Sequence, residues 1–197
     1  MWDQRYDRPD YLFGTRPAQF LVDQASHIPE NSRILCVADG EGRNSVYLAE
    51  LGHKVTAFDA SPIGVGKAQE LAAQRGVELQ LEISSVEDWD WSNQYDAAVA
   101  IFIQFATPDL RQQLFRQMVE AIRPGGLLLL HGYAPRQVEY GTGGPNQASH
   151  MYTLDMLQQA FAQLQILRLE DYDAFIDEGE GHSGNSALVD LIARKCQ

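Results

Sequence analysis

The chain has 197 residues, of which 45% are hydrophobic and 21% charged, and its formal net charge is -12 at pH 7. This length and composition favour one globular domain, residues 1–197, with one sizeable core. The 27 acidic and 15 basic side chains would repel phosphate backbones and anionic lipid headgroups over much of the surface. We therefore expect neither a nucleic acid nor a membrane as a partner.

The start of the chain and its two cysteines argue against secretion and metal binding. Residues 1–5 lack the basic-then-apolar arrangement of a secretory signal, and no apolar run approaches the roughly 20 residues that span a bilayer. Cys36 and Cys196 make neither a disulfide framework nor a zinc cluster. We expect a cytoplasmic protein with reduced thiols and no metal ion.

From residue 33 onward, short β-branched runs alternate with amphipathic segments, a pattern typical of a parallel sheet with helical crossovers. Residues 1–30 precede this alternation and are expected to form an N-terminal cover and a first helix, and residues 31–197 the α/β core. The first five strands are predicted at residues 33–38, 54–58, 79–83, 96–102 and 126–131.

Helices are predicted where a hydroxyl residue precedes a proline. Ser61-Pro62 and Thr107-Pro108 can each cap the free N–H groups of a first turn in which proline needs no donor. A further helix is predicted from Thr153. Two closing strands, residues 165–169 and 187–193, lie about 20 residues apart with no convincing helix between them, so we expect them to pair antiparallel. The predicted fold is α/β, with about seven strands, mostly parallel with the last one reversed, and helices on both faces.

Two features at the predicted carboxyl ends of strands point to an adenosine-containing ligand. Ligands bind at this edge of an open parallel sheet. Asp39-Gly40-Glu41-Gly42-Arg43-Asn44 follows the first strand, and its glycines allow a sharp turn close to a ligand. Asp59 follows the second strand, 17 residues beyond Gly42, where a carboxylate can accept the hydroxyl protons of a ribose.

The dinucleotide cofactor NAD is the alternative ligand. Its fingerprint has a third glycine where this sequence has Ser45, and the chain leaves little room for a separate substrate domain. Both points argue against an NAD-dependent oxidoreductase.

Several segments together resemble class I S-adenosylmethionine-dependent methyltransferases of the small-molecule kind, related to the tellurite-resistance and thiol methyltransferases. The resemblance extends over nearly the whole chain and is carried by residues 2–6 with 11–17, 40–44, 56–61, 123–126 and 140–145. It implies a Rossmann-like methyltransferase fold, S-adenosylmethionine as cofactor with S-adenosylhomocysteine as product, and an N-terminal cover over cofactor and substrate.

The resemblance also implies a set of cofactor-binding residues: Phe13, Asp39, Gly40, Glu41, Gly42, Asn44, Asp59, Ala60, Ser61, Ser85, Val86, Ile101, Phe102 and Gln104. The chain departs from the family at Cys36 and Ala38, where an acid and a glycine are usual. Either Asp39 or Glu41 takes the place of that acid. Ser85 stands in a stretch where the family often has an aspartate near the adenine amino group, and we expect it to accept a hydrogen bond there.

Methyl transfer from a sulfonium is an in-line displacement that depends mainly on alignment and exclusion of water. The sequence contains no persuasive base, which favours a nucleophile that attacks unaided, such as a thiolate, selenite or tellurite. Arg43 is a candidate for orienting an anionic substrate. Tyr133 and Tyr140 either position the nucleophile or pack a lid. A non-catalytic S-adenosylmethionine-binding protein is the alternative of a different class.

Three further features have two interpretations each. Tyr6, Tyr11 and Phe13 either surround the sulfonium or staple the N-terminal segment. His182, in the acidic, glycine-rich stretch 177–182, either belongs to a solvated loop or touches the substrate, because the loop between the last two strands should rise at the active edge. Its spacing from the carboxylates matches no defined metal-ligand pattern, so a metal site is less favoured than substrate contact. His131 is either a core histidine or a contact on the cofactor side.

Overall fold

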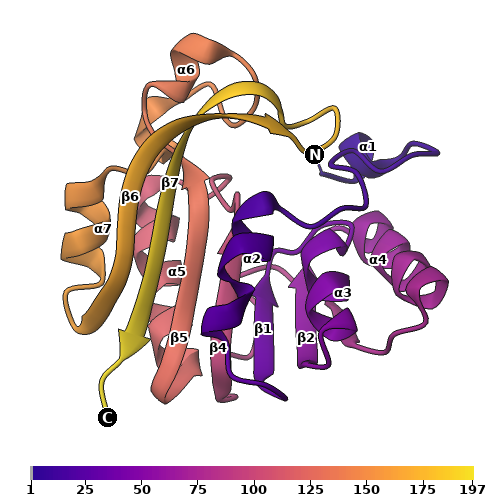
Figure 1. Ribbon diagram of the computed structural model, residues 1–197. Helices are drawn as coiled ribbons and strands as arrows, with labels where there is room; N and C mark the ends of the chain where they lie inside the picture. Colours follow the sequence, from indigo (N-terminus) through magenta and orange to yellow (C-terminus); the bar gives the residue numbers. More distant parts are fainter. Residues whose placement is uncertain (1) are drawn as a thin grey trace.

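Seven strands form a single sheet in the order β3-β2-β1-β4-β5-β7-β6 in the computed structural model, which describes residues 2–197 (Figure 1). The strands are β1 (Arg33–Val37), β2 (Lys54–Asp59), β3 (Gln80–Ile83), β4 (Tyr95–Ile101), β5 (Ile122–Tyr133), β6 (Leu164–Asp177) and β7 (Ser183–Lys195). Strands β1 to β5 pair parallel, and β7 pairs antiparallel with both β5 and β6. The predicted α/β fold with a reversed last strand is confirmed.

Helices cover both faces of this sheet (Figure 1). They are α1 (Trp2–Tyr6), α2 (Gln19–Gln24), α3 (Arg43–Glu50), α4 (Pro62–Arg75), α5 (Pro108–Ala121), α6 (Gln137–Tyr140) and α7 (Leu154–Ala160), with short 3-10 helices at Ala25–His27 and Ala148–His150. Helices α2 and α3 pack on one face and α5 and α7 on the other. Within residues 2–197 there is no helix long and apolar enough to cross a membrane.

The predicted caps start three of these helices. The hydroxyls of Ser61, Thr107 and Thr153 accept hydrogen bonds from the backbone N–H groups of Gly64, Leu110 and Met156, at the beginnings of α4, α5 and α7. Each bond satisfies one of the free donors of a first turn. The helical crossovers therefore begin where local sequence chemistry placed them.

The core has two parts because side chains of a strand alternate between the faces of the sheet. In β1, Ile34 and Cys36 pack with α2 and α3, whereas Leu35 and Val37 pack with α5 and α7. On α5, Leu114 and Met118 are buried. Cys36 is buried and Cys196 is exposed.

The last two strands are much longer than predicted, which is a correction. Residues 170–177 and 183–186, predicted as a loop, continue β6 and β7, and pairing extends to the Asp177–Ser183 pair. The cause is that β6 is an edge strand, so polar residues such as Asp173 lie in it without burial. The hairpin tip, residues 178–182, therefore lies above the sheet beside α1 (Figure 1).

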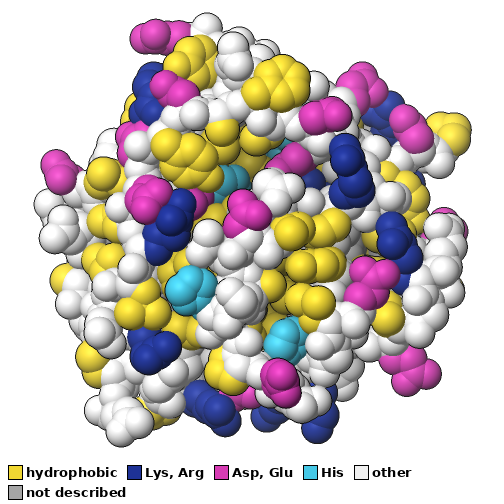
Figure 2. Space-filling model, viewed as in Figure 1, with side chains coloured by type: hydrophobic (Ala, Val, Ile, Leu, Met, Phe, Trp, Pro, Cys, Tyr) yellow, Lys and Arg dark blue, Asp and Glu magenta, His cyan; other side chains and the backbone are white. Residues whose placement is uncertain are grey.

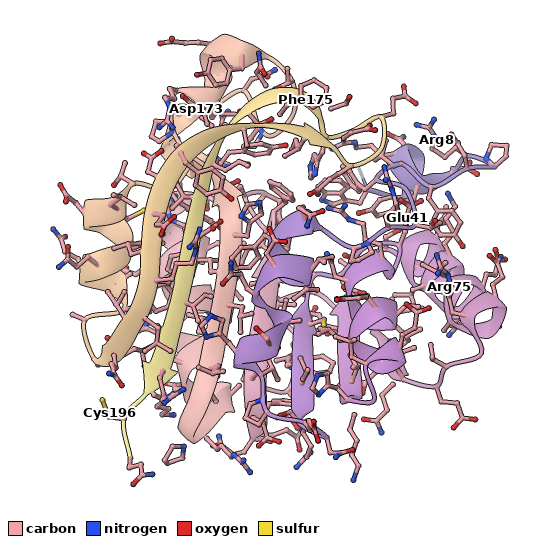
Figure 3. The ribbon with its side chains drawn as sticks, in the orientation of Figure 1. Arg8, Glu41, Arg75, Asp173, Phe175 and Cys196 are labelled. Carbon is pink, nitrogen blue, oxygen red and sulfur yellow. The ribbon has the colours of Figure 1, made fainter. Side chains whose placement is uncertain are left out.

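The N-terminal segment is attached to both halves of the molecule. Leu12 donates its backbone N–H to Glu41 and accepts a hydrogen bond from the N–H of Gly181 at the hairpin tip. Ala18 donates to the side-chain oxygen of Asn44 on α3. Figure 3 shows labelled Glu41 beneath this segment and Arg8 within it. The segment thus lies across the carboxyl edge of the sheet.

Candidate active site

A cavity of about 630 Å³ lies at the carboxyl ends of the strands, within the size range of small-molecule sites. Its walls come from the turns after β1, β2, β3 and β4, from the end of β5, and from the hairpin tip. The N-terminal segment and the loop 144–150 add further walls. The cavity therefore lies at the edge where the sheet topology places ligands.

Asp59, the predicted ribose acid, is buried in the wall of this cavity. Its carboxylate accepts hydrogen bonds from the backbone N–H of Gly40 at 2.9 Å and of Ser61 at 2.8 Å. It therefore joins the turn after β1 to the turn after β2. Burial raises the pKa of Asp59 above its usual value. A carboxylate has about four acceptor sites, so two remain for a ligand.

Gly40 is required in this turn for two reasons. Its backbone is left-handed, with φ of 63°. A Cβ atom at this position would lie 2.7 Å from the hydroxyl oxygen of Tyr6, on helix α1. The glycine therefore allows the N-terminal segment to approach the turn closely.

Asp39 and Glu41, the two alternatives for the first acid, have different surroundings. Glu41 is buried, and its carboxylate accepts from Leu12 N and from Lys67 Nζ, both at 2.8 Å. The Asp39 carboxylate accepts from the hydroxyl of Ser45, and Asp39 lines the cavity. Burial raises the pKa of Asp39 to about 7. Glu41 thus holds the N-terminal segment, and Asp39 is the acid with acceptor capacity left for a ligand.

Ala38 stands where the related methyltransferases usually have a glycine, and its backbone conformation shows why glycine is usual there. Its backbone is left-handed, with φ of 49°, a conformation that glycine adopts without strain. Phe102, at the end of β4, is likewise left-handed, with φ of 56°. Both residues line the cavity, so two strained positions shape its floor.

Most of the other predicted cofactor residues line the same cavity. They are Phe13, Gly40, Asn44, Ala60, Ser85, Val86, Ile101, Phe102 and Gln104. Some of their polar groups are already engaged. The Ser85 hydroxyl bonds to Asp88, and the Gln104 amide bonds both to the N–H and to the carbonyl of Tyr133. Gln104 therefore supports Tyr133 from below.

Gly42 and Ser61 are not among the residues that line the cavity, and their role as cofactor contacts stays a prediction. A Cβ atom on Gly42, whose φ is 88°, would lie 2.5 Å from the Cβ of Ala68, so this glycine allows α3 and α4 to pack closely. Ser61 caps α4 and donates its hydroxyl to Asp3. Both residues affect the shape of the site indirectly, through the packing and the first turn of α4.

The three predicted catalytic residues have different fates. Arg43 is buried and forms an ion pair with Glu178 of the hairpin at 2.7 Å. Tyr133 lines the cavity, and burial raises the pKa of its phenol. Tyr140 ends helix α6, is 38% exposed and lies outside the cavity, and its catalytic role stays a prediction. The chain turns at Gly141, so residues 144–147 and not Tyr140 face the cavity.

His131 and His182 have different surroundings. His131 lies in the core, with Nδ1 2.7 Å from Asp190 and its ring stacked on Phe20. His182 lies in the cavity wall, and its ring centroid is 4.4 Å from that of Phe13. Burial lowers the pKa of His182 well below its usual value, and the nearby Arg43 adds to this.

Sequence reasoning missed several cavity residues. Trp2 and Arg5 come from α1, Phe105 from the turn after β4, and residues 144–150 contribute Asn146 and Gln147 among others. Position relative to the strand ends indicated the loops but not these side chains. Within residues 2–197, no grouping of His, Cys, Asp or Glu side chains is suited to hold a metal ion.

Known proteins resemble this chain in sequence and in structure. Residues 34–126, slightly less than half of the chain, match the family model described as a methyltransferase domain. Ubiquinone biosynthesis O-methyltransferase of Xanthomonas axonopodis pv. citri is 32% identical over 121 residues, which are 60% of this chain and 50% of that protein. The matched residues include the turn after β1 and Asp59. The chain carries a class I S-adenosylmethionine-dependent methyltransferase domain.

A second relative matches this methyltransferase domain over nearly its whole length. Hemagglutinin 1 of Eikenella corrodens is 25% identical over 196 residues, 96% of this chain and 64% of that protein. The chain thus spans about half of the first relative and under two thirds of the second.

Solved structures share the fold at low identity. The N-methyltransferase NodS of Bradyrhizobium japonicum in complex with S-adenosylhomocysteine has a TM-score of 0.74 and 12% identity, with 100% of this chain and 97% of that chain covered. TehB of Haemophilus influenzae has a TM-score of 0.72 and 19% identity, with 89% and 61% covered. At these identities the likeness shows the methyltransferase fold alone.

S-adenosylmethionine is the cofactor of this methyltransferase domain. Its residues fit that group: Asp39 and Asp59 face one cavity with acceptor capacity left, and Gly40 allows close approach. Ser45, at the third glycine position of a dinucleotide fingerprint, is fully buried and bonded to Asp39. The NAD-dependent alternative is therefore not supported.

The N-terminal cover of the methyltransferase domain is aromatic on its cavity side. The rings of Trp2 and Tyr6 stack with their centroids 5.5 Å apart, and the Phe13 centroid lies 6.4 Å from that of Tyr6. The Arg5 guanidinium lies over the Trp2 ring. Trp2, Tyr6 and Phe13 line the cavity, whereas Tyr11 bonds to the carbonyl of Lys67 outside it. Aromatic faces attract cations, which suits a sulfonium.

Proposed function

We propose that the protein transfers a methyl group from S-adenosylmethionine to a small-molecule acceptor. One observation carries the proposal: Asp39, just after β1, and Asp59, at the end of β2, line one cavity, and the Asp59 carboxylate accepts a hydrogen bond from the backbone N–H of Gly40. When bound, the cofactor supplies an electrophilic methyl group on a sulfonium sulfur.

Each end of the cofactor has a matching residue. Asp59 would accept the ribose hydroxyls, and Asp39 would accept from the ammonium of the methionine part. Ser85 and Val86, after β3, would border the adenine. The N-terminal segment and the hairpin tip would exclude water, which strengthens the electrostatic interactions within the cavity.

The enclosure and charge of the protein favour a small acceptor over a nucleic acid. The net charge is -12, and Figure 2 shows acidic and basic side chains interspersed with no continuous basic patch on the face in view. Such a surface gives little attraction for a phosphate backbone.

Among small acceptors, a thiol fits better than a chalcogen oxyanion such as tellurite or selenite. Arg43 and Lys67 are each paired with a carboxylate, at 2.7 and 2.8 Å, so an oxyanion would have to compete with Glu178 or Glu41 for them. Arg5, which also lines the cavity, lies over the rings of Trp2 and Phe13. A thiol needs no cation partner.

The test combines isothermal titration with an assay of S-adenosylhomocysteine release across thiols, hydroxyl compounds, amines, selenite and tellurite. We expect micromolar cofactor binding and release with at least one acceptor. D59A should weaken cofactor binding about 10- to 100-fold, from the loss of charge-assisted hydrogen bonds of about 1.5–3 kcal/mol. D109A, at an exposed site on α5, is the matched control. Cofactor binding without turnover on any acceptor would instead support a non-catalytic binding protein.

A further inference from the structure

The sheet topology separates the cofactor side of the cavity from a second side. In the order β3-β2-β1-β4-β5-β7-β6, the chain runs outward from β1 to β2 and, in the other direction, from β4 to β5, so a crevice opens between the carboxyl ends of β1 and β4. Asp39 and Asp59 lie on the side of β1. The turn after β4 contributes Phe102, Gln104 and Phe105 to the opposite wall, where an acceptor has room beside the cofactor.

His150 is bound to this turn. It lies in the 3-10 helix Ala148–His150 and lines the cavity, and its Nδ1 is 3.1 Å from the backbone carbonyl oxygen of Gln104. On either side of it, the carbonyls of Ser149 and Met151 accept from the guanidinium of Arg111, on α5, at 2.8 and 3.5 Å. The imidazole is therefore held in one place against the end of β4.

The contact with Gln104 determines which nitrogen of His150 carries the proton. A carbonyl oxygen only accepts hydrogen bonds, so Nδ1 must donate, and the lone pair of the neutral ring lies on Nε2. Nε2 has no hydrogen-bond partner among residues 2–197, and it is not one of the buried polar atoms that lack a partner, so solvent reaches it. A residue of the cavity wall thus offers an open lone pair, as a general base must.

The surroundings of His150 tolerate a positive charge on its ring. The residue is half-buried, so water still solvates it. Within residues 2–197 the cavity wall has four carboxyl groups and two guanidinium groups, those of Asp39, Glu41, Asp59, Glu87, Arg5 and Arg43. Behind the wall, Lys67 pairs with Glu41 and Glu178 with Arg43, which leaves the excess of acidic groups unchanged. Arg111 is the cation packed against the loop of His150, and its guanidinium donates to the two carbonyls.

The wall on the side of His150 is uncharged apart from that histidine. Phe102, Phe105 and Pro145 are apolar, and Asn146 and Gln147 are neutral amides. Such a wall suits a neutral acceptor. A neutral thiol or hydroxyl compound has to lose its proton when it attacks, so it gains from a base within hydrogen-bond reach.

We propose that the acceptor is a neutral molecule with a protonated thiol or hydroxyl group, and that His150 Nε2 takes this proton during methyl transfer. The inference rests on the proposed function. The acceptor lone pair forms the bond to the methyl carbon, the carbon–sulfur bond breaks with its electron pair going to sulfur, and the acceptor proton moves to Nε2. One positive charge leaves the sulfonium and one appears on the imidazolium, so the cavity keeps its net charge.

The first test compares two thiols as acceptors of wild type and H150N at pH 7.5. The asparagine can still donate to the carbonyl of Gln104, but it has no lone pair at the position of Nε2. Benzyl mercaptan is mostly protonated at this pH and thiophenol is mostly ionised, so only the first needs a base. We expect H150N to be about 100-fold slower than wild type with benzyl mercaptan, the lower end of the range for general-base catalysis, and within about threefold with thiophenol.

H27N, at an exposed histidine before β1, is the matched control and should equal wild type with both thiols. Unchanged affinity of H150N for S-adenosylhomocysteine shows that the cavity is intact. Equal slowing with both thiols would mean that His150 only supports the loop. Rates of H150N within about threefold of wild type with benzyl mercaptan would mean that no base acts there. Either result would overturn the inference.

The second readout needs no turnover. Long-range proton–nitrogen NMR spectra of the protein labelled with nitrogen-15 histidine distinguish the two neutral tautomers, and the signals of His150 are those that H150N lacks. In the complex with S-adenosylhomocysteine at pH 8.5, we expect the proton on Nδ1. A proton on Nε2 would contradict the inference, because that nitrogen would then have no lone pair for the acceptor.

The two readouts separate failure of the inference from failure of the proposed function. Release of S-adenosylhomocysteine with selenite or tellurite alone, equal in wild type and H150N, would leave the methyltransferase function standing and overturn the inference. Absence of release with every acceptor would overturn the function, and the tautomer of His150 would still decide whether a lone pair faces the cavity.

Discussion

The pH dependence of cofactor affinity should depend on Asp39. Burial raises the pKa of this carboxyl to about 7, while Ser45 provides its one side-chain hydrogen bond. Only the ionised form attracts the ammonium of the cofactor. Because the pKa is raised, the attraction is full above pH 7 and is lost as the pH falls through 7. The affinity should drop about tenfold for each pH unit below 7, or about 1.4 kcal/mol per unit.

Above pH 8 the affinity should fall again, because the α-amino group of the cofactor loses its proton, and so its charge, near pH 7.7–8.0. The affinity of wild type should therefore be greatest between pH 7 and 8. D39N should abolish the loss of affinity below pH 7, and it should reduce the affinity at pH 7.5 by about 10- to 100-fold. Isothermal titration from pH 5.5 to 8.5 at constant ionic strength measures both effects.

Two controls make this assignment refutable. 5′-Methylthioadenosine lacks the amino-acid part of the cofactor, so its affinity should not vary over this range. D109N, at an exposed site on α5, should retain the profile of wild type. A profile of wild type that is flat from pH 5.5 to 7, or one that D39N preserves, would show that Asp39 does not face the ammonium.

Three further substitutions test the supports of the site. A38G relieves the strain of a left-handed alanine. It should raise the free energy of unfolding in urea titrations by about 0.5–1 kcal/mol, after the greater chain entropy of glycine in the unfolded state is subtracted. A loss of stability would show that the strain is absent. G42A forces a Cβ against Ala68 and should cost about 2 kcal/mol or more in the same titrations, without direct loss of a cofactor contact. E178Q leaves the buried Arg43 without its counter-charge and should lower stability by about 3 kcal/mol, whereas R16A, at an exposed arginine, should cost under about 0.5 kcal/mol.

Features that depend on neighbouring residues could be predicted from the sequence. The cap at Ser61, the first strand and the turn at Gly40 are determined by side chains within a few positions. The structure has all three, with the strand ending at Val37, one residue before the predicted end. Asp59 was identified by its spacing from the glycine turn, because that spacing reflects one helical crossover.

Features that depend on distant partners could not be predicted. The choice between Asp39 and Glu41 depends on Leu12 and Lys67, 29 and 26 residues from Glu41. The role of Arg43 depends on Glu178, 135 residues away. No pattern around Arg43 indicates that a hairpin will neutralise it. The length of β6 was missed for a different reason. Its acidic residues suggest a solvated loop, and Phe175, which is 70% exposed, interrupts the alternation of apolar and polar side chains.

The N-terminal segment and the hairpin tip, residues 178–182, border the same cavity, which has a consequence for folding during synthesis. Gln19 and Arg43 bond to Glu178, and Leu12 bonds to Gly181, so the cavity is enclosed only after residue 181 has left the ribosome. A nascent chain that ends before residue 177 already has Asp39 and Asp59 but no enclosure. Ribosome-bound intermediates should therefore bind the cofactor weakly and exchange it fast, and tight retention should begin only with the hairpin.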